Sequence, residues 1–210
     1  MFRLYKGDCL RILPILINTG IKVDTIICDP PFGKSAKTWD NPLSFQELWK
    51  LFKQFRKPTT NILVFSKQPY TSMVNESNIK EFRYELIWEK SQKAKPYNSE
   101  KEFVPTHENI SVFYEKLGVC NPQVLGTKSK PIYPNSILTF DEVKKGKHPA
   151  QKPADLLEYL IKTYSNEDDI VLDCTMGSGS TGIACVKLNR NFIGIESSDK
   201  YFKIAEKEIQ

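Results

Sequence analysis

The chain has 210 residues, enough for one globular domain and too few for two domains of ordinary size. Hydrophobic residues make up 40% of it and charged residues 26%, a balance that excludes a disordered or fibrous protein. The sequence contains no run of about 18 uncharged apolar residues, and its charged start, MFRLYKGD, differs from a signal peptide, so we expect a cytoplasmic protein.

Short apolar runs alternate with helical stretches along the chain, a pattern typical of an α/β fold. The apolar runs predict seven strands, at residues 2–5, 25–28, 61–65, 84–88, 110–114, 170–173 and 192–196. The helical stretches predict helices at 9–17, 45–56, 70–75, 154–164, 181–188 and from 199 to the C-terminus. Because such continuously apolar strands are buried on both faces, we expect a mostly parallel sheet with helices on both sides.

Two proline-rich stretches, 90–105 and 117–149, interrupt this pattern. From Lys116 to Lys152 seven lysines are set against two acidic residues, so this segment carries the whole net charge of +5. Such a segment favours phosphate contacts with nucleic acid; a solvated lysine-rich face is the plainer alternative. We therefore interpret the chain as a single domain, 1–210, in which 116–147 is a short basic insertion and candidate target-recognition region. The candidate DNA-binding residues are Lys90, Lys93, Lys95, Lys128, Lys130, Lys144, Lys145 and Lys147.

The cysteines and histidines do not suggest a metal site. The five cysteines are odd in number and show neither CxxC nor Cys/His ligand spacing, and there are only two histidines. This composition argues against a disulfide framework and against zinc. We expect reduced thiols and no metal.

A glycine-rich loop follows the predicted strand at 170–173. Gly177, Gly179 and Gly182 have GxGxxG spacing between a strand and a helix, the context of a loop that binds a nucleotide or nucleoside cofactor. Glu196 ends the next predicted strand, where its carboxylate can accept hydrogen bonds from two ribose hydroxyls. A plain Gly/Ser turn is the alternative, but the glycines, their flanks and the trailing acid all favour a cofactor loop.

The charge of Asp173, at the tip of the strand before this loop, indicates which cofactor fits. A fixed negative charge repels a pyrophosphate and attracts a cationic amino group, which disfavours NAD and favours S-adenosylmethionine. A P-loop is excluded because no Lys-Ser/Thr pair follows the glycines. Only one predicted strand and one helix follow the loop, so the chemistry must lie upstream.

The upstream candidate is Asp29-Pro30-Pro31-Phe32, directly after the predicted strand at 25–28. Ligands of open α/β sheets bind beyond the carboxyl ends of the strands, so this tetrapeptide is expected to face the same crevice as the glycine loop. The Asp29 carboxylate and the Pro30 carbonyl can each accept one N–H of a planar exocyclic amine, and Phe32 offers a face for stacking a base. A proline turn after a core strand is the structural alternative.

Together these motifs resemble the DNA amino-methyltransferases that act on adenine or cytosine exocyclic nitrogens, in the permuted beta-class order, over most of the chain. DPPF is similar to the family's catalytic motif and VLDCTMGSGSTG to its cofactor loop. YKGDCLRIL resembles its N-terminal GD element, HPAQKP the motif ahead of the cofactor strand, and YELIWEK and HENISVFYE its late strands. The resemblance implies a Rossmann-like, S-adenosylmethionine-dependent methyltransferase with circularly permuted motif order.

The resemblance also implies roles for individual residues. Asp8 would contact the adenine of the cofactor, and the motif containing His148 and Lys152 would help to hold its methionine part. Cys174 and Thr175 depart from the family's Pro and Phe, so an aromatic wall beside the cofactor is missing or comes from another side chain. The implied catalytic set is Asp29, Pro30, Pro31 and Phe32. The implied cofactor-binding set is Asp8, Cys9, His148, Lys152, Asp173, Met176, Gly177, Ser178, Gly179, Thr181 and Glu196.

We therefore predict methyl transfer from S-adenosylmethionine to the N6 amine of a flipped adenine in double-stranded DNA. Adenine is preferred because the resemblance associates Asp at the first motif position with adenine. The alternatives are N4-cytosine methylation, methylation of an RNA base or a protein glutamine, and a catalytically idle DNA-binding subunit. The sequence leaves open the recognition site, a homodimer and a cognate restriction nuclease.

Overall fold

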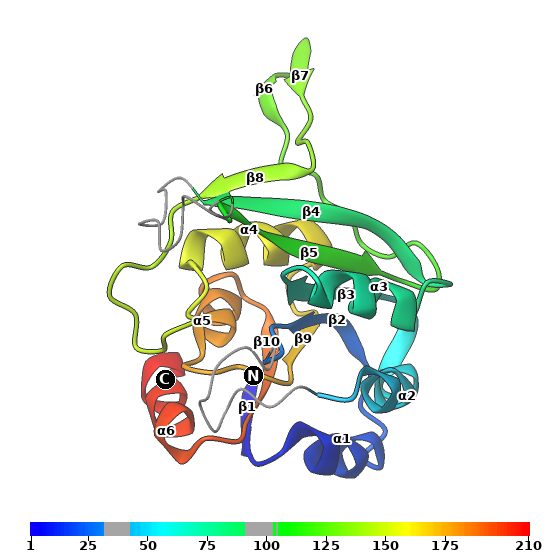
Figure 1. Cartoon of the computed structure of the whole chain (residues 1–210), viewed down its shortest axis with the longest axis vertical. Helices are drawn as coiled ribbons and strands as arrows, with labels where there is room; N and C mark the ends of the chain where they lie inside the picture. The colour runs from blue at the N-terminus through cyan, green and yellow to red at the C-terminus, as the bar shows by residue number, and fades with distance from the viewer. Residues whose placement is uncertain (32–42, 91–102, 104) are drawn as a thin grey trace.

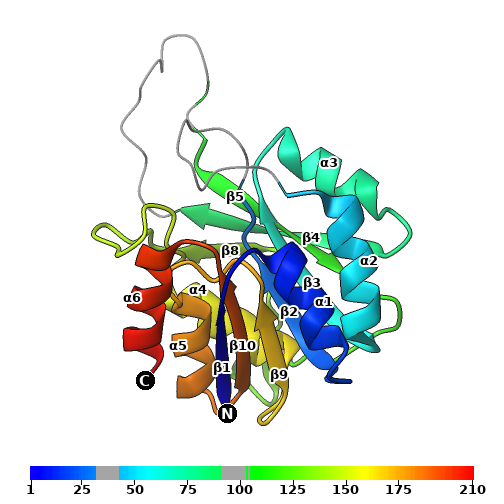
Figure 2. The same ribbon diagram turned by 90° about the horizontal axis from the view of Figure 1, so that it is seen from below.

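A central sheet lies between two layers of helices in the computed structural model, which describes residues 1–31, 43–90, 103 and 105–210 (Figure 1). Helices α1 (Cys9–Ile17), α2 (Phe45–Phe55) and α3 (Tyr70–Ser77) cover one face. Helices α4 (Ala154–Tyr164), α5 (Ser180–Lys187) and α6 (Asp199–Ile209) cover the other (Figure 2). This is the expected arrangement of a sheet with helices on both sides.

The sheet has the strand order β1-β10-β9-β2-β3-β5-β4-β8. Its strands are β1 (Phe2–Lys6), β2 (Val23–Cys28), β3 (Arg56–Ser66), β4 (Phe82–Lys90), β5 (His107–Phe113), β8 (Ile137–Phe140), β9 (Ile170–Asp173) and β10 (Asn191–Glu196). Strand β5 runs antiparallel to its neighbours β3 and β4, and all other neighbours in this sheet are parallel. The carboxyl ends of the parallel strands and the beginning of β5 therefore meet at one edge.

Alternation along the strands divides the core between the two faces of the sheet. Ile26 packs beneath α1 and α2, whereas its neighbour Ile27 packs on the side of α4 and α5, and Ile62 and Leu63 divide in the same way. This is the period of two expected of strands that are buried on both faces. No helix within the described residues combines the length and the apolar character needed to cross a membrane.

All seven predicted strands and all six predicted helices are present, with shifts at their ends. The number of strands in the main sheet was wrong, because β8 pairs parallel to β4 at the edge and makes it eight-stranded. Strand β8 lies inside the segment that we interpreted as an insertion. Its four residues bury only Leu138 fully, so the sequence there carries little of the hydrophobic signal of a strand.

The rest of the 116–147 segment includes a small antiparallel hairpin. Strands β6 (Leu125–Thr127) and β7 (Lys130–Ile132) pair only with each other, and the hairpin projects away from the body of the molecule (Figure 1). All six residues of these two strands are exposed. The basic insertion therefore consists of an edge strand, which completes the sheet, and an arm that reaches into solvent.

Candidate functional site

A cavity of about 820 Å³ opens at the carboxyl edge of the sheet. It brings the two sequence motifs together: Asp29, Pro30 and Pro31 follow β2, and the loop of residues 174–179 follows β9. Ten of the eleven predicted cofactor residues line it, namely Asp8, Cys9, His148, Lys152, Asp173, Met176, Gly177, Ser178, Thr181 and Glu196. Phe32, the fourth residue of the predicted catalytic motif, lies outside the described residues.

Gly179 is the predicted cofactor residue that does not line the cavity. Its φ of 89° is left-handed, and a Cβ there would lie 2.8 Å from Ile209 Cδ1 and 2.9 Å from Ala205 Cβ of α6. Gly182, one turn into α5, would place a Cβ 2.7 Å from the ring of Phe192. These two glycines allow the loop and α5 to pack tightly against α6 and β10. Gly179 and Gly182 therefore serve the packing of the core, whereas other residues of the glycine loop line the cavity.

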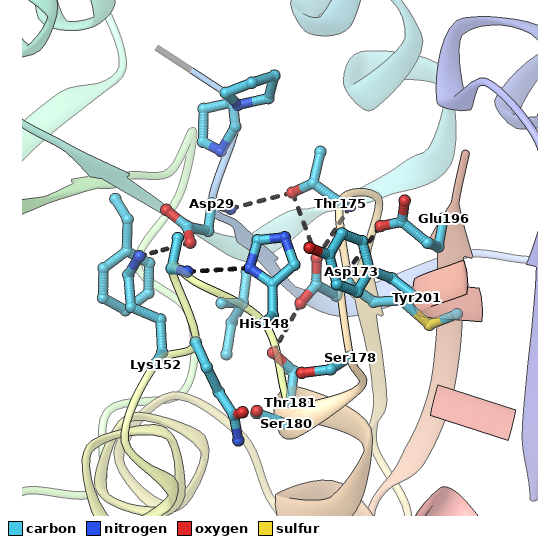
Figure 3. A pocket seen from close by; sticks show the side chains of 18 of the residues that line it. Asp29, His148, Lys152, Asp173, Thr175, Ser178, Ser180, Thr181, Glu196 and Tyr201 are labelled. Carbon is cyan, nitrogen blue, oxygen red and sulfur yellow. Dashed lines mark hydrogen bonds and ion pairs between the residues drawn. The ribbon is translucent and has the colours of Figure 1, made fainter. Parts of the chain in front are cut away.

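Asp173 ends β9 and is almost fully buried, with 3% exposure. Its Oδ2 accepts a hydrogen bond from the Thr181 hydroxyl at 2.6 Å, and its Oδ1 accepts one from the Thr175 N–H at 3.0 Å (Figure 3). Burial raises the pKa of Asp173 to about 7, and the negative charges of Asp29 and Glu196 also raise it. The carboxylate is therefore poised to gain from a nearby cation.

Thr175, which departs from the expected family sequence, connects the two motifs. Its Oγ1 accepts a hydrogen bond from the Asp29 N–H at 3.1 Å and lies 3.5 Å from Asp173 Oδ1. A phenylalanine at this position would provide neither contact. The preceding residue, Cys174, has its Sγ 3.5 Å from Cys28 Sγ in the core between the strand ends. Two small polar side chains thus hold β2 and β9 together where the cavity begins.

Aromatic surface in the cavity comes from elsewhere in the chain. The imidazole of His148 meets the ring of Tyr201 edge to face, with 4.2 Å between their centroids, and both line the cavity (Figure 3). His148 also lies beside the loop, since a Cβ on Gly177 would be 3.8 Å from its ring. This pair supplies an aromatic wall that positions 174 and 175 lack.

Glu196 fastens the loop to the end of β10. Its Oε2 accepts a hydrogen bond from the Gly177 N–H at 3.0 Å, and its Oε1 accepts one from the Ser198 N–H at 2.6 Å. Burial raises the pKa of Glu196, although these backbone N–H groups oppose the rise. Hydrogen bonds from Ser197 act in the same direction, so several donors hold this carboxylate at the wall of the cavity.

Asp29 is joined to a network of charges, most of them buried. Lys152 Nζ lies 2.5 Å from Asp29 Oδ2 and 3.5 Å from Glu108 Oε2. Glu108 also pairs with Lys67 at 3.0 Å and with Lys90 at 2.9 Å. Although burial opposes this, the charges of Lys152, Lys67 and Lys90 lower the pKa of Glu108 to about 2. Burial dominates at Asp29 and raises its pKa despite the attraction of Lys152.

Sequence reasoning missed Glu108 and Lys67 as members of the site. Glu108 is the second residue of β5 and is buried beside Asn109 and Ile110. An acid at the start of an apolar strand was the available signal, but in a parallel strand it would lie at the opposite edge of the sheet. Since β5 is antiparallel, its beginning lies at the functional edge, and Lys67 reaches the same point from the end of β3. Tyr201 was missed because nothing in the helical pattern of α6 distinguishes it.

The predicted DNA-binding lysines fall into different environments. Lys128 and Lys130 are exposed on the β6–β7 hairpin, and Lys144 and Lys145 are exposed near the cavity, which Lys144 lines. Lys147 is exposed and pairs with Glu208 at 2.5 Å. Lys90 departs from the prediction, because its side chain is 12% exposed and its ammonium pairs with Glu108 and Glu142. Lys93 and Lys95 lie outside the described residues.

The described part of the chain holds no group of three or more His, Cys, Asp or Glu side chains arranged to bind a metal ion. The polar side chains that line the cavity are carboxylates, hydroxyls, lysines, one imidazole and one amide. One of the hydroxyls, Ser180 Oγ, is buried and finds no hydrogen-bond partner among the described residues. A ligand with a donor or acceptor group would satisfy it.

Known proteins match both the sequence and the structure. A family described as DNA methylase matches residues 23–207. The Type II methyltransferase M2.LlaDCHI of Lactococcus lactis subsp. cremoris is 42% identical over 84 residues, which cover 40% of this chain but only 31% of that enzyme. The Type II methyltransferase M2.DpnII of Streptococcus pneumoniae is 28% identical over 222 residues, covering 90% of this chain and 82% of that enzyme.

Among solved structures, the M1.HpyAVI–SAM complex superposes with a TM-score of 0.78 and 30% sequence identity, over 99% of both chains. The likeness therefore extends through the sheet and both helical layers. With the family match over residues 23–207, it identifies this chain as a member of the DNA methylase family.

Proposed function

We propose that this protein transfers the methyl group of S-adenosylmethionine to the N6 amine of an adenine flipped out of double-stranded DNA. The observation that carries the proposal is the shared cavity, in which Asp29 and Pro30 lie next to a buried acid, Asp173, and to the loop fastened by Glu196. A methyl acceptor and a cationic methyl donor can meet there. Membership of the DNA methylase family supports DNA as the substrate.

The cavity fits the proposed cofactor in size and charge. A volume of about 820 Å³ is ample for one nucleoside-sized ligand and a base beside it. Asp173 offers a negative charge to the α-ammonium group, Glu196 offers acceptors to hydroxyls, and His148 with Tyr201 offers an aromatic surface. When bound, S-adenosylmethionine supplies an electrophilic methyl group on a sulfonium. The absence of a lysine from the loop of residues 174–179 agrees with a ligand that carries no phosphate.

The chain's own residues prepare the amine for attack. The Asp29 carboxylate and the Pro30 carbonyl accept its two N–H groups and turn the nitrogen lone pair away from the base plane. Pro31 has no N–H that would compete for these acceptors. As the nitrogen takes the methyl group it becomes cationic, so the anionic Asp29 gains strength as an acceptor in the transition state.

Target recognition is assigned to the exposed parts of the 116–147 segment. The β6–β7 hairpin presents Lys128 and Lys130, and Lys144 and Lys145 lie beside the cavity. Phosphate contacts at these positions would hold the duplex across the cavity mouth. We keep Lys147 in this set, because its ion pair with Glu208 is on the surface and weak, and leave Lys90 out, because its charge is neutralised inside the network.

The first prediction tests the charge of Asp29. Asp29→Asn keeps an acceptor oxygen but loses the anion, so the single-turnover rate on duplex DNA with saturating cofactor should fall ~100-fold or more. Affinity for S-adenosylmethionine should stay within a few fold. Asp24→Asn, at the other end of β2, is the matched control and should retain the wild-type rate. A near-normal rate for Asp29→Ala would contradict the assignment of Asp29. Analysis of the methylated product separates N6-adenine from N4-cytosine, RNA and protein targets.

The second prediction concerns pH and Asp173. Since the pKa of Asp173 is about 7 in the cofactor-free protein and binding an ammonium favours the ionised form, cofactor affinity should fall as the pH drops below 7. Calorimetric titration from about pH 5.5 to about pH 7.5 should show a loss approaching tenfold per unit. Asp173→Asn should bind weakly and lose most of this dependence, whereas Asp169→Asn, directly before β9, should retain it. A flat wild-type profile would remove Asp173 from the ammonium site.

The third prediction concerns the basic arm. Replacing Lys128, Lys130, Lys144, Lys145 and Lys147 by Gln should lower the slope of log affinity against log salt by about 0.9 for each DNA phosphate that these lysines neutralise in the wild type. Cofactor affinity should not change. Gln at Lys187 and Lys203, two exposed lysines on α5 and α6, serves as the control and should leave the slope unaltered. If the fivefold variant keeps the wild-type slope, the duplex lies on another surface.

A further inference from the structure

Glu108 lies at the centre of three ammonium groups at the inner end of the cavity. Its side chain is 6% exposed, and Lys67, Lys90 and Lys152 approach it from the end of β3, the end of β4 and the residues before α4. Only Lys152 continues to Asp29, at 2.5 Å, with its own side chain 9% exposed. Two successive ion pairs thus connect Glu108 through Lys152 to Asp29, the proposed acceptor of the target amine.

This network is poorly explained as a stabilising feature. Ions lose their hydration when they are buried, and replacing a buried ion pair by apolar side chains is often neutral or stabilising. The apolar environment is present, since the ring of Phe65 lies 5.1 Å from Lys152 Nζ and Trp88 pairs with Glu108 across β4 and β5. The sheet edge nevertheless holds three lysines there, which points to a role in the chemistry.

A direct role for Lys152 in holding the cofactor, as the sequence motif implied, fits the charges less well. The α-carboxylate of S-adenosylmethionine would attract an ammonium and its sulfonium and α-ammonium would repel one, but the ammonium of Lys152 is already paired with Asp29 and Glu108. In the structure Lys152 points its charge at Asp29 and Glu108, and the acid nearest the loop, Asp173, is bonded by Thr175 and Thr181 (Figure 3). Lys152 belongs to the acceptor side of the cavity.

We propose that Lys152 and Glu108 are positioning residues for methyl transfer: Lys152 holds one oxygen of Asp29 and keeps the carboxylate anionic, and Glu108 holds Lys152 in place. This inference rests on the proposed function and names the device that makes Asp29 effective. Lys152 fixes Oδ2, so the other oxygen accepts the N–H of the target amine. Glu108 shares the ammonium and so prevents Lys152 from neutralising Asp29 completely.

The two partners act on Asp29 with opposite sign. The positive charge of Lys152 lowers the pKa of Asp29, and the negative charge of Glu108 raises it. Lys67 contributes a weaker lowering, while the negative charge of Asp29 raises the pKa of Asp173. Removing Lys152 should therefore make Asp29 harder to ionise, and removing the charge of Glu108 should make it easier.

The test is the pH profile of single-turnover methyl transfer to duplex DNA, with cofactor and DNA both saturating, from about pH 5 to about pH 9.5. In Lys152→Met the acid limb of the profile should move up by ~1–3 units, so on the acid side of the limb the rate should fall by up to about tenfold for each unit of the shift and recover much of the loss near pH 9. In Glu108→Gln the limb should move to lower pH. Lys152→Arg keeps a cation and should retain a limb near that of the wild type.

Control variants distinguish a failure of this proposal from a failure of the proposed function. Lys187→Met removes an exposed lysine of α5 and should leave the profile unchanged. A Lys152→Met enzyme whose rate falls equally at every pH, or whose limb is unmoved while cofactor affinity drops, would overturn the proposal. If Lys152→Met does not fold, Glu108→Gln decides, because a limb that stays in place or moves up overturns it. A wild-type enzyme that methylates no DNA at any pH would refute the proposed function instead.

Discussion

The ammonium of Lys152 lies 2.5 Å from a carboxylate that burial would otherwise tend to protonate. Transferring a charge from water into an apolar cavity costs several kcal/mol unless a partner compensates it, so an acid that must stay ionised needs such a neighbour. Asp29, Glu108 and Asp173 all face this constraint. Lysines outweigh burial at Glu108 and offset it in part at Asp29, whose pKa stays raised, whereas Asp173 has only the hydrogen bonds from Thr175 and Thr181.

This difference divides the cavity into two electrostatic halves. On the acceptor side, lysines and carboxylates pair within the protein, and Asp29 has its counter-ion before any substrate arrives. On the cofactor side, Asp173 has no cation of its own among the described residues, and its pKa is raised to about 7. A cationic ligand completes the second half and leaves the first undisturbed. The arrangement favours a positively charged methyl donor beside Asp173 and a neutral amine beside Asp29.

The geometry of the sheet makes these halves possible. Parallel strands β2 and β9 are neighbours, so Asp29 and Asp173 emerge side by side at their carboxyl ends. The antiparallel β5 then brings an acid from the beginning of a strand to the same edge. Tight packing at Gly179 and Gly182 lets α5 and α6 lie close to β10, so that Tyr201 of α6 reaches His148. Glu108, Asp173 and Tyr201 thus lie in elements that also belong to the core, and Asp29 and Lys67 directly follow such elements.

Local patterns in the sequence were sufficient to predict the helices, most strands, the layered α/β class and both motifs, and the family resemblance added further cofactor residues, so that ten of the eleven predicted cofactor residues line the cavity. Periodicity and glycine spacing are properties of residues that lie close together in the sequence, so they can be recognised without knowledge of the tertiary structure. Tertiary structure alone decided that β5 is antiparallel, that β8 joins the edge of the sheet and that Glu108 and Lys67 enter the site. It also placed Lys152 on Asp29 and Gly179 against α6. Strand direction and pairing depend on contacts between residues far apart in the chain, and ion pairs depend on which side chains those contacts bring within a few ångströms.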